Sequence, residues 1–142
     1  MGKVSLIEIA IRMSLSLLSI TGIFVFKADL HAEQQWEKYY DGNRSTFYYD
    51  KKSLHYPYKD NNKIIAAWTK NIPSIYLSHN QESIGYFSDL IYIDCEKIKY
   101  RRTEMLIYND SDELIMRQMG RPTYYTIDSG SEAEALLQKV CP

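Results

Sequence analysis

The two cysteines are the residues whose chemistry this sequence constrains most. Cys95 ends a strand-like apolar run that begins at Leu90, and Cys141 ends a short amphipathic helical pattern. Two such thiols can form a disulfide, act as a redox pair or stay separately free. No Cys-x-x-C motif is present to lower a thiol pKa, and two distant cysteines supply too few ligands for a metal site. We therefore expect a structural Cys95–Cys141 disulfide, with free thiols or a redox pair as the alternatives.

The histidines and acids do not combine into a catalytic or metal-binding pattern. His55 and His79 lie in polar stretches with no carboxylate at ligand spacing, so we interpret them as solvent-exposed loop residues. Asp94 is the one acid in an apolar run, and we expect it to form hydrogen bonds at the end of a strand. The chain has no serine flanked by glycines, no plausible Cys/His pair and no pair of carboxylates in an apolar context. We expect a protein that is not an enzyme and that uses no metal or cofactor.

Tyrosine and basic residues are the side chains best suited to binding another protein. All 13 tyrosines follow residue 32, which is more than the core of a small domain needs. Tyrosine supplies a large contact area at low entropic cost. Basic residues alternate after Cys95, so they share one face of a strand. This stripe could meet a polyanion or an acidic patch of a partner, although a solvated face is the simpler interpretation. The candidate contacts are Tyr56, Tyr58 and Tyr76 in loops, with Lys97, Lys99 and Arg101 as a charged rim.

The elements that must position these side chains are mostly strands. Alternating or apolar runs rich in tyrosine and isoleucine predict six of them, at residues 36–40, 46–50, 64–70, 88–95, 100–108 and 113–119. Residues 51–63 and 71–83 are expected to be loops. A tight turn or bulge should fall near Glu96 and Lys97, because the apolar positions change parity there.

One helix is expected at the C-terminal end, over about residues 131–140. Ser131 with Glu134, or Ser129 with Glu132, has the spacing of a capping box that begins a helix. Apolar residues then recur at helical spacing and form one stripe: Ala133, Leu136, Leu137, Val140 and Cys141. The expected fold class is α+β, an antiparallel β-meander of about six strands with one C-terminal helix tied to the sheet by a disulfide.

The first 32 residues have the pattern of a secretory signal peptide. Lys3 and Arg12 precede a 14-residue apolar segment, residues 13–26, and Ala32 is a small residue at the expected cleavage point. A membrane-spanning helix needs about 20 apolar residues, so we expect cleavage, with an uncleaved anchor as the alternative. The remaining residues 33–142 are expected to form one domain without an integral membrane span.

The charge of residues 33–142 argues against general nucleic-acid binding. Removing the signal leaves 14 basic and 16 acidic residues, a net charge near −2. General nucleic-acid binding requires a clear basic excess. We therefore do not expect a nucleic-acid partner.

Several short motifs follow one another in a defined order along residues 33–142. They are Trp36, residues 47–54, Ala67-Trp68, residues 93–95, Tyr100-Arg101, residues 129–131 and Val140-Cys141. This ordered set resembles the surface-adhesin protein E-like family of small exported bacterial domains. The resemblance implies a Gram-negative envelope protein with an antiparallel sheet, a C-terminal helix and a Cys95–Cys141 bridge. The chain departs from the family in lacking a lipid-anchor cysteine and in having Tyr124 or Tyr125 where a tryptophan is usual.

The resemblance also implies a function, namely adhesion to host extracellular-matrix or serum proteins. Two other functions compete with it: a structural or accessory periplasmic domain without a host ligand, and an inhibitor of an envelope or host enzyme. The expected location is the periplasm or the outer surface of a Gram-negative bacterium. A homodimer is compatible with each of these functions. No binding residue transfers from the family, because its binding stretches are variable loops.

Overall fold

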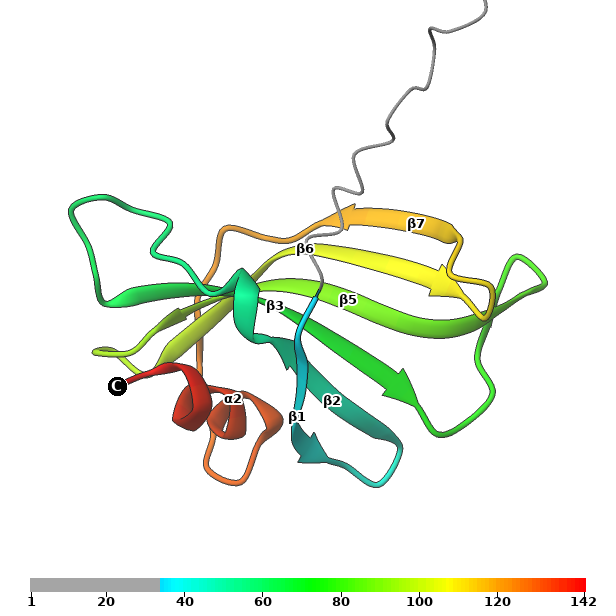
Figure 1. Ribbon diagram of the computed structural model, residues 1–142, viewed down its shortest axis with the longest axis horizontal. Helices are drawn as coiled ribbons and strands as arrows, with labels where there is room; N and C mark the ends of the chain where they lie inside the picture. The colour runs from blue at the N-terminus through cyan, green and yellow to red at the C-terminus, as the bar shows by residue number, and fades with distance from the viewer. Residues whose placement is uncertain (1–33) are drawn as a thin grey trace, which may run out of the picture. The chain divides into compact units, whose positions relative to one another are not determined.

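The structure, a computed structural model, describes residues 34–142, so the expected signal peptide lies outside the described residues. Six antiparallel strands form the main path of one sheet, in the order β1-β2-β3-β5-β6-β7 (Figure 1). Their bounds are β1 Trp36–Asp41, β2 Ser45–Asp50, β3 Ile64–Pro73, β5 Glu82–Asp94, β6 Lys99–Asn109 and β7 Leu114–Met119. A 3-10 turn, η1 (Lys51–Ser53), follows β2, and the helix α2 spans Glu132–Val140. The predicted β-meander with one C-terminal helix is therefore confirmed.

The strand count differs from the prediction, because the sheet has eight strands among the described residues. The two additional strands are short: β4 (Ser78–His79) pairs with β5, and β8 (Tyr125–Thr126) pairs with β6. Each consists of two residues, which is too short for an alternating pattern to be recognised in the sequence. β8 lies along the start of β6, whereas β7 pairs with its other half.

The prediction of one long loop over residues 71–83 was wrong. β3 continues to Pro73, β5 begins at Glu82, and β4 forms a small hairpin with the start of β5. Asn80 and Gln81 make the turn of this hairpin with left-handed φ angles of 48° and 69°. Pro73 is compatible with a strand here because it is the last residue of β3, where one missing donor costs little. His79 is consequently a strand residue rather than a loop residue.

The hydrophobic core lies between α2 and one face of the sheet, which we call the helix face. Its buried members come from three strands, the segment before α2 and α2 itself: Tyr49, Ile65, Ile91, Ile93, Ile127, Leu136 and Val140. All five residues of the predicted apolar helix stripe contact or belong to this cluster. The opposite face, which we call the open face, carries no helix in the described part of the chain. Side chains alternate between these two faces along each strand.

The start and end of α2 agree with the sequence analysis. Ser131 is the N-cap, and its hydroxyl accepts a hydrogen bond from the Glu134 N–H at 3.2 Å, while the Glu134 carboxylate accepts one from the Gly130 N–H at 2.6 Å. Cys141 is the C-cap and is bonded to Cys95, with 5.7 Å between the two Cα atoms. The predicted disulfide is therefore confirmed, and it ties the end of α2 to the end of β5.

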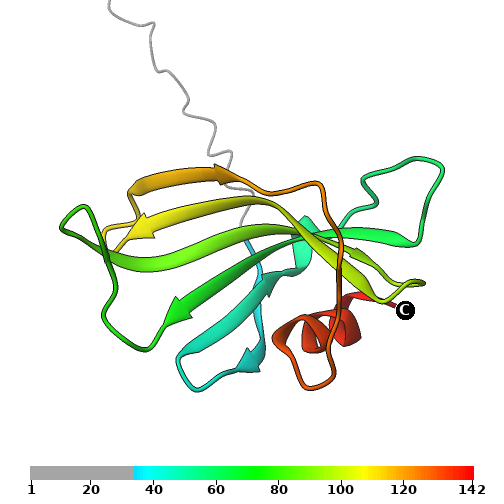
Figure 2. The ribbon, with the colours of Figure 1, turned by 180° about the vertical axis from the view of Figure 1, so that it is seen from behind.

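The two ends of the sheet carry different loops, and both views show this arrangement (Figures 1 and 2). The 54–63 segment and the β5–β6 turn lie at one end, close to the C-terminus, and the β3–β4 connection lies at the other. The β5–β6 turn falls at residues 95–98, as expected from the change of parity. Asp94 holds this turn, because its Oδ1 accepts hydrogen bonds from the N–H groups of Glu96 and Lys97 at 3.2 and 2.9 Å. Its expected role at the strand end is confirmed.

Gly120 allows the chain to pass close to β6 after β7. Its N–H donates a hydrogen bond to the Thr103 carbonyl at 2.9 Å, and a Cβ atom here would lie 1.8 Å from the Arg102 carbonyl oxygen. Gly120→Ala is expected to lower the free energy of unfolding by about 1–3 kcal/mol, because the backbone must move to admit the methyl group. Urea denaturation would measure this. Gly42→Ala is the control and should cost less, since its closest approach is 3.3 Å to a side-chain atom. Equal losses would contradict the argument.

Candidate functional site

Five of the six candidate contact residues lie at one end of the sheet, which we call the loop end. It consists of the 54–63 segment, the β5–β6 turn at 95–98 and the start of β6 (Figure 1). Two contacts join these parts: the Cys95 N–H donates to the Lys63 carbonyl at 2.9 Å, and Lys63 forms an ion pair with Glu96. The candidates found here are Tyr56, Tyr58, Lys97, Lys99 and Arg101.

Arg101 is the centre of a cluster with three tyrosines, which we call the tyrosine–arginine cluster: Tyr58, Tyr92, Arg101 and Tyr124. The guanidinium carbon lies 5.0 Å from the ring centroid of Tyr92 and 5.2 Å from that of Tyr124. One guanidinium nitrogen donates a hydrogen bond to the Tyr58 hydroxyl at 3.0 Å. A guanidinium at these distances from a ring face is attracted by the ring's quadrupole. The cluster therefore fixes the 54–63 segment to the sheet through a side chain of β6.

The register of the sheet explains why these side chains meet. Tyr92 on β5 is directly opposite Arg101 on β6, so both side chains lie on the open face. Tyr125 pairs with Tyr100 on the helix face, and alternation therefore places Tyr124 beside Arg101. Tyr124 and Tyr92 were not among the predicted site residues. The adjacent pair Tyr124-Tyr125 was visible in the sequence, but its pairing with β6 was not.

Two polar atoms of the tyrosine–arginine cluster are left without partners. Arg101 Nε and the Tyr124 hydroxyl are both buried and form no hydrogen bond with any described residue. Burial raises the pKa of Tyr124, although the nearby Arg101 charge acts in the opposite direction, so the hydroxyl stays protonated at neutral pH. Leaving buried polar groups unpaired costs stability, and each such group in a folded protein requires an explanation.

The basic residues at the loop end do not form a uniform stripe of free charges. Arg101 is engaged with the tyrosines, while Lys97 lies in the turn and Lys99 at the first position of β6, both exposed. Arg102 lies on the helix face, where its Nε is 2.8 Å from Asp89 Oδ1. The free positive charge of the predicted rim is therefore that of Lys97 and Lys99.

Tyr76 is separated from the other candidates. It lies in the β3–β4 connection at the opposite end of the sheet and is 77% exposed (Figures 1 and 2). A single small binding surface cannot include both Tyr76 and the loop end. This separation makes Tyr76 a useful internal control for experiments on Tyr56 and Tyr58.

The open face carries a second group of aromatic residues that the sequence analysis did not single out. The Lys70 ammonium lies 5.1 Å from the Trp36 ring centroid and 4.1 Å from that of Tyr86. Tyr86 in turn stacks on Tyr108, with 4.8 Å between ring centroids. These residues come from four strands, so only the sheet pairing brings them together.

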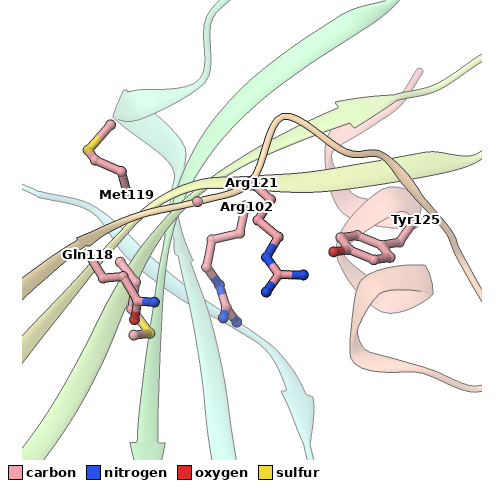
Figure 3. Close-up of a pocket in the computed structure, with 7 residues that line it drawn as sticks. Arg102, Gln118, Met119, Arg121 and Tyr125 are labelled. Carbon is pink, nitrogen blue, oxygen red and sulfur yellow. The ribbon is translucent and has the colours of Figure 1, made fainter.

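A pocket of about 190 Å³ lies beside β6, β7 and the segment that follows β7. Arg102 and Arg121 both project into it, with Gln118 and Tyr125 also on its wall (Figure 3). The polar side-chain groups of these residues can all donate hydrogen bonds. The pocket is separate from the loop end and contains none of the predicted candidates.

The histidines take part in local contacts. His55 is exposed, with Nδ1 2.8 Å from the Ser53 carbonyl oxygen, and His79 Nε2 lies 3.2 Å from the Asn80 amide nitrogen. Within residues 34–142 no three histidine, cysteine or acidic side chains are grouped so that they could hold a metal ion. The same residues include no helix of the length and apolarity required to cross a membrane.

Comparison with known proteins adds no relative, since no family model, curated protein or solved structure matches this chain.

Proposed function

We propose that this protein is an exported, non-enzymatic protein-binding module of a Gram-negative cell envelope, and that it binds through the loop end. The observation that carries the proposal is that the 54–63 segment exposes two tyrosines, Tyr56 at 57% and Tyr58 at 41%, and that Arg101 fixes the second of them by donating a hydrogen bond to its hydroxyl. Exposed tyrosines on a fixed backbone supply contact area with little entropy to lose. The disulfide is consistent with export, because such bonds persist in oxidising compartments.

The charge of the loop end indicates the kind of surface it would bind. Lys97 and Lys99 are exposed, while Lys63 is already paired with Glu96. A partner surface with an apolar centre surrounded by acidic residues would complement this arrangement. Charges at the rim of an interface mainly affect the association rate and its salt dependence. The resemblance to surface-adhesin protein E-like proteins favours host extracellular-matrix or serum proteins as the partners.

Alanine replacement of the loop-end tyrosines is expected to weaken binding to such a partner. Tyr56→Ala and Tyr58→Ala should each lower the binding free energy by about 2 kcal/mol, the size typical of an interface hot spot. This corresponds to roughly a 30-fold loss of affinity. Tyr58→Phe keeps the ring and removes only the hydroxyl that accepts from Arg101, so it should retain most of the affinity. Surface plasmon resonance with immobilised matrix and serum proteins would measure these changes.

The matched control is Tyr76→Ala, which removes an exposed tyrosine at the opposite end of the sheet and should leave binding unchanged. An equal loss for Tyr76→Ala would contradict the assignment of the loop end. Absence of saturable binding to any host protein, together with protection from protease on intact cells, would instead favour an accessory periplasmic domain. A single tight stoichiometric enzyme partner in a pull-down would favour an inhibitor.

A further inference from the structure

A second pocket, of about 150 Å³, lies where the helix face of the sheet meets the first turn of α2. Five strands and the helix contribute to its wall. Its rings come from Tyr39 and Phe47, and its polar groups include those of Asn71, Asp89 and Glu132. The space is sufficient for a few water molecules or a small organic group. None of these residues belongs to the loop end.

Asp89 is the most unusual residue of this pocket. Its side chain is only 9% exposed, and burial raises its pKa to about 6, against the opposing effect of the Arg102 charge. Arg102 Nε lies 2.8 Å from Oδ1, yet this oxygen accepts no hydrogen bond of acceptable geometry from any described residue. The distance is short enough for a hydrogen bond, so the Arg102 N–H must point away from Oδ1. The two groups therefore attract each other as opposite charges without forming a hydrogen bond. A buried carboxylate oxygen thus retains unused capacity as an acceptor.

Two further acceptors face the same space. The Asn71 side-chain oxygen is buried and has no hydrogen-bond partner among the described residues. Glu132 lines the pocket from α2 and is exposed, so its carboxylate can turn toward an occupant. Three oxygen-bearing side chains on β3, β5 and α2 therefore surround a space that contains one cationic group, that of Arg102. Two carboxylates against one guanidinium leave an excess negative charge.

We propose that this pocket binds a primary ammonium group, presented either by a free alkylamine or by a lysine side chain of a protein partner. An ammonium has three N–H donors that point in different directions, which suits three acceptors on three separate elements. A guanidinium would instead pair with both oxygens of one carboxylate, and the Asp89 carboxylate already lies against the Arg102 guanidinium. The rings of Tyr39 and Phe47 also line the pocket, and aromatic rings can attract a cation and contact its methylene groups. One bound ammonium neutralises the excess negative charge.

The experiment is a titration of the isotope-labelled protein, followed by nuclear magnetic resonance, with three probes that each carry a four-carbon chain ending in the tested group. The probes are n-butylamine, Nα-acetyl-lysine-N-methylamide and, as the uncharged control, n-butanol. The amine is expected to produce saturable shifts of the Asn71, Asp89 and Ala133 amide signals, and butanol is not. Saturation by the lysine derivative as well would identify a lysine side chain as an accepted source. Saturation by butylamine alone would assign the pocket to free amines.

Variants separate the pocket from unspecific charge attraction. Glu132→Gln is expected to weaken amine binding about threefold, and Asp89→Asn at least tenfold. Glu82→Gln is the matched control, because it removes an exposed carboxylate outside the pocket and should leave binding unchanged. Thermal unfolding of each variant verifies folding, and the surface variant Glu132→Gln keeps the test decisive if Asp89→Asn does not fold.

Lowering the pH from 7.5 to 5 should weaken binding as Asp89 takes up a proton. The charged and titratable groups that line the pocket are Tyr39 on β1, Asp89 on β5, Tyr100 and Arg102 on β6 and Glu132 on α2. Burial raises the pKa of Asp89 to about 6, which falls inside this interval. Butylamine binding that persists undiminished at pH 5 would contradict the role of Asp89.

The proposal is overturned if neither butylamine nor the lysine derivative saturates the pocket. Equal binding of butanol would also overturn it, because it would show an apolar site. The lysine source depends on the proposed protein-binding function, whereas the free-amine source does not. Because the titration uses no protein partner, failure of host-protein binding and failure of the ammonium site give separate results.

Discussion

Replacement of Cys141 by serine is expected to lower the free energy of unfolding by about 2–5 kcal/mol, the usual cost of removing a native disulfide from a small domain. The bridge joins residues 46 positions apart and constrains the unfolded chain accordingly. It also holds the last turn of α2 on the sheet, where Leu136 and Val140 are 2% and 8% exposed. Loss of the bond releases the end of the helix that buries them. Guanidinium denaturation of the oxidised protein and the variant would measure the difference.

The control is the double variant Cys95→Ser with Cys141→Ser. Each single substitution removes the same bond, so the double variant should lose little more stability than either single one. Additive losses would show that the two sulfurs contribute separately. Free reaction of both thiols with an alkylating reagent in the native wild-type protein would contradict the bridge directly, and so would peptide mapping without reductant that recovers the two peptides unlinked.

Substitution of Asp89 by asparagine is expected to stabilise the protein at neutral pH by up to about 3 kcal/mol. Burial raises the pKa of Asp89 from 3.8 to about 6, which corresponds to roughly 1.4 kcal/mol per unit. The folded state therefore binds this proton more tightly than the unfolded state does. Its contribution to stability is fully present below pH 3.8 and is lost as the pH rises through 6. An asparagine does not ionise, so the variant keeps its stability as the pH rises. Arg102 loses its charged partner in the variant, but its side chain is 52% exposed and can be solvated by water.

Urea denaturation between pH 3.5 and 8 would test this prediction. The stability difference between variant and wild type should grow from pH 4 to pH 7 and then level off. Asp60→Asn is the control, an exposed aspartate whose replacement should leave the pH profile unchanged. A variant less stable than the wild type at pH 7 would show that the Asp89–Arg102 pair outweighs the cost of burying the carboxylate.

The part of the fold that was predicted correctly depends on local patterns. Alternation of apolar residues identified the six main strands, and the spacing of Ser131 and Glu134 identified the start of α2. The disulfide followed from there being only two cysteines, at the end of a strand and the end of a helix. These signals lie within a few residues of the elements that they define, so a single sequence is sufficient to recognise them.

The features that were missed depend on pairing between distant segments. β8 exists because Tyr125 meets Tyr100, and no pattern within residues 120–127 reveals that contact. Arg101 was expected to be part of a free basic stripe, but the register of β5 and β6 places it among tyrosines. The buried setting of Asp89 likewise comes from α2 crossing the sheet far along the chain. Of the candidate site, the sequence therefore supplied the residue types but not their grouping, while export and the partner remain predictions.

The position of Cys95 has a consequence for recognition as well as for stability. This residue directly precedes the β5–β6 turn, and its N–H donates to the Lys63 carbonyl at the end of the 54–63 segment. The covalent bond to α2 thus reduces the conformational freedom of both segments before any partner arrives. A partner that docks at the loop end has less disorder to remove, and this pre-organisation appears directly as affinity. Reduction of the protein would then slow or weaken capture even under conditions in which the sheet itself stays folded.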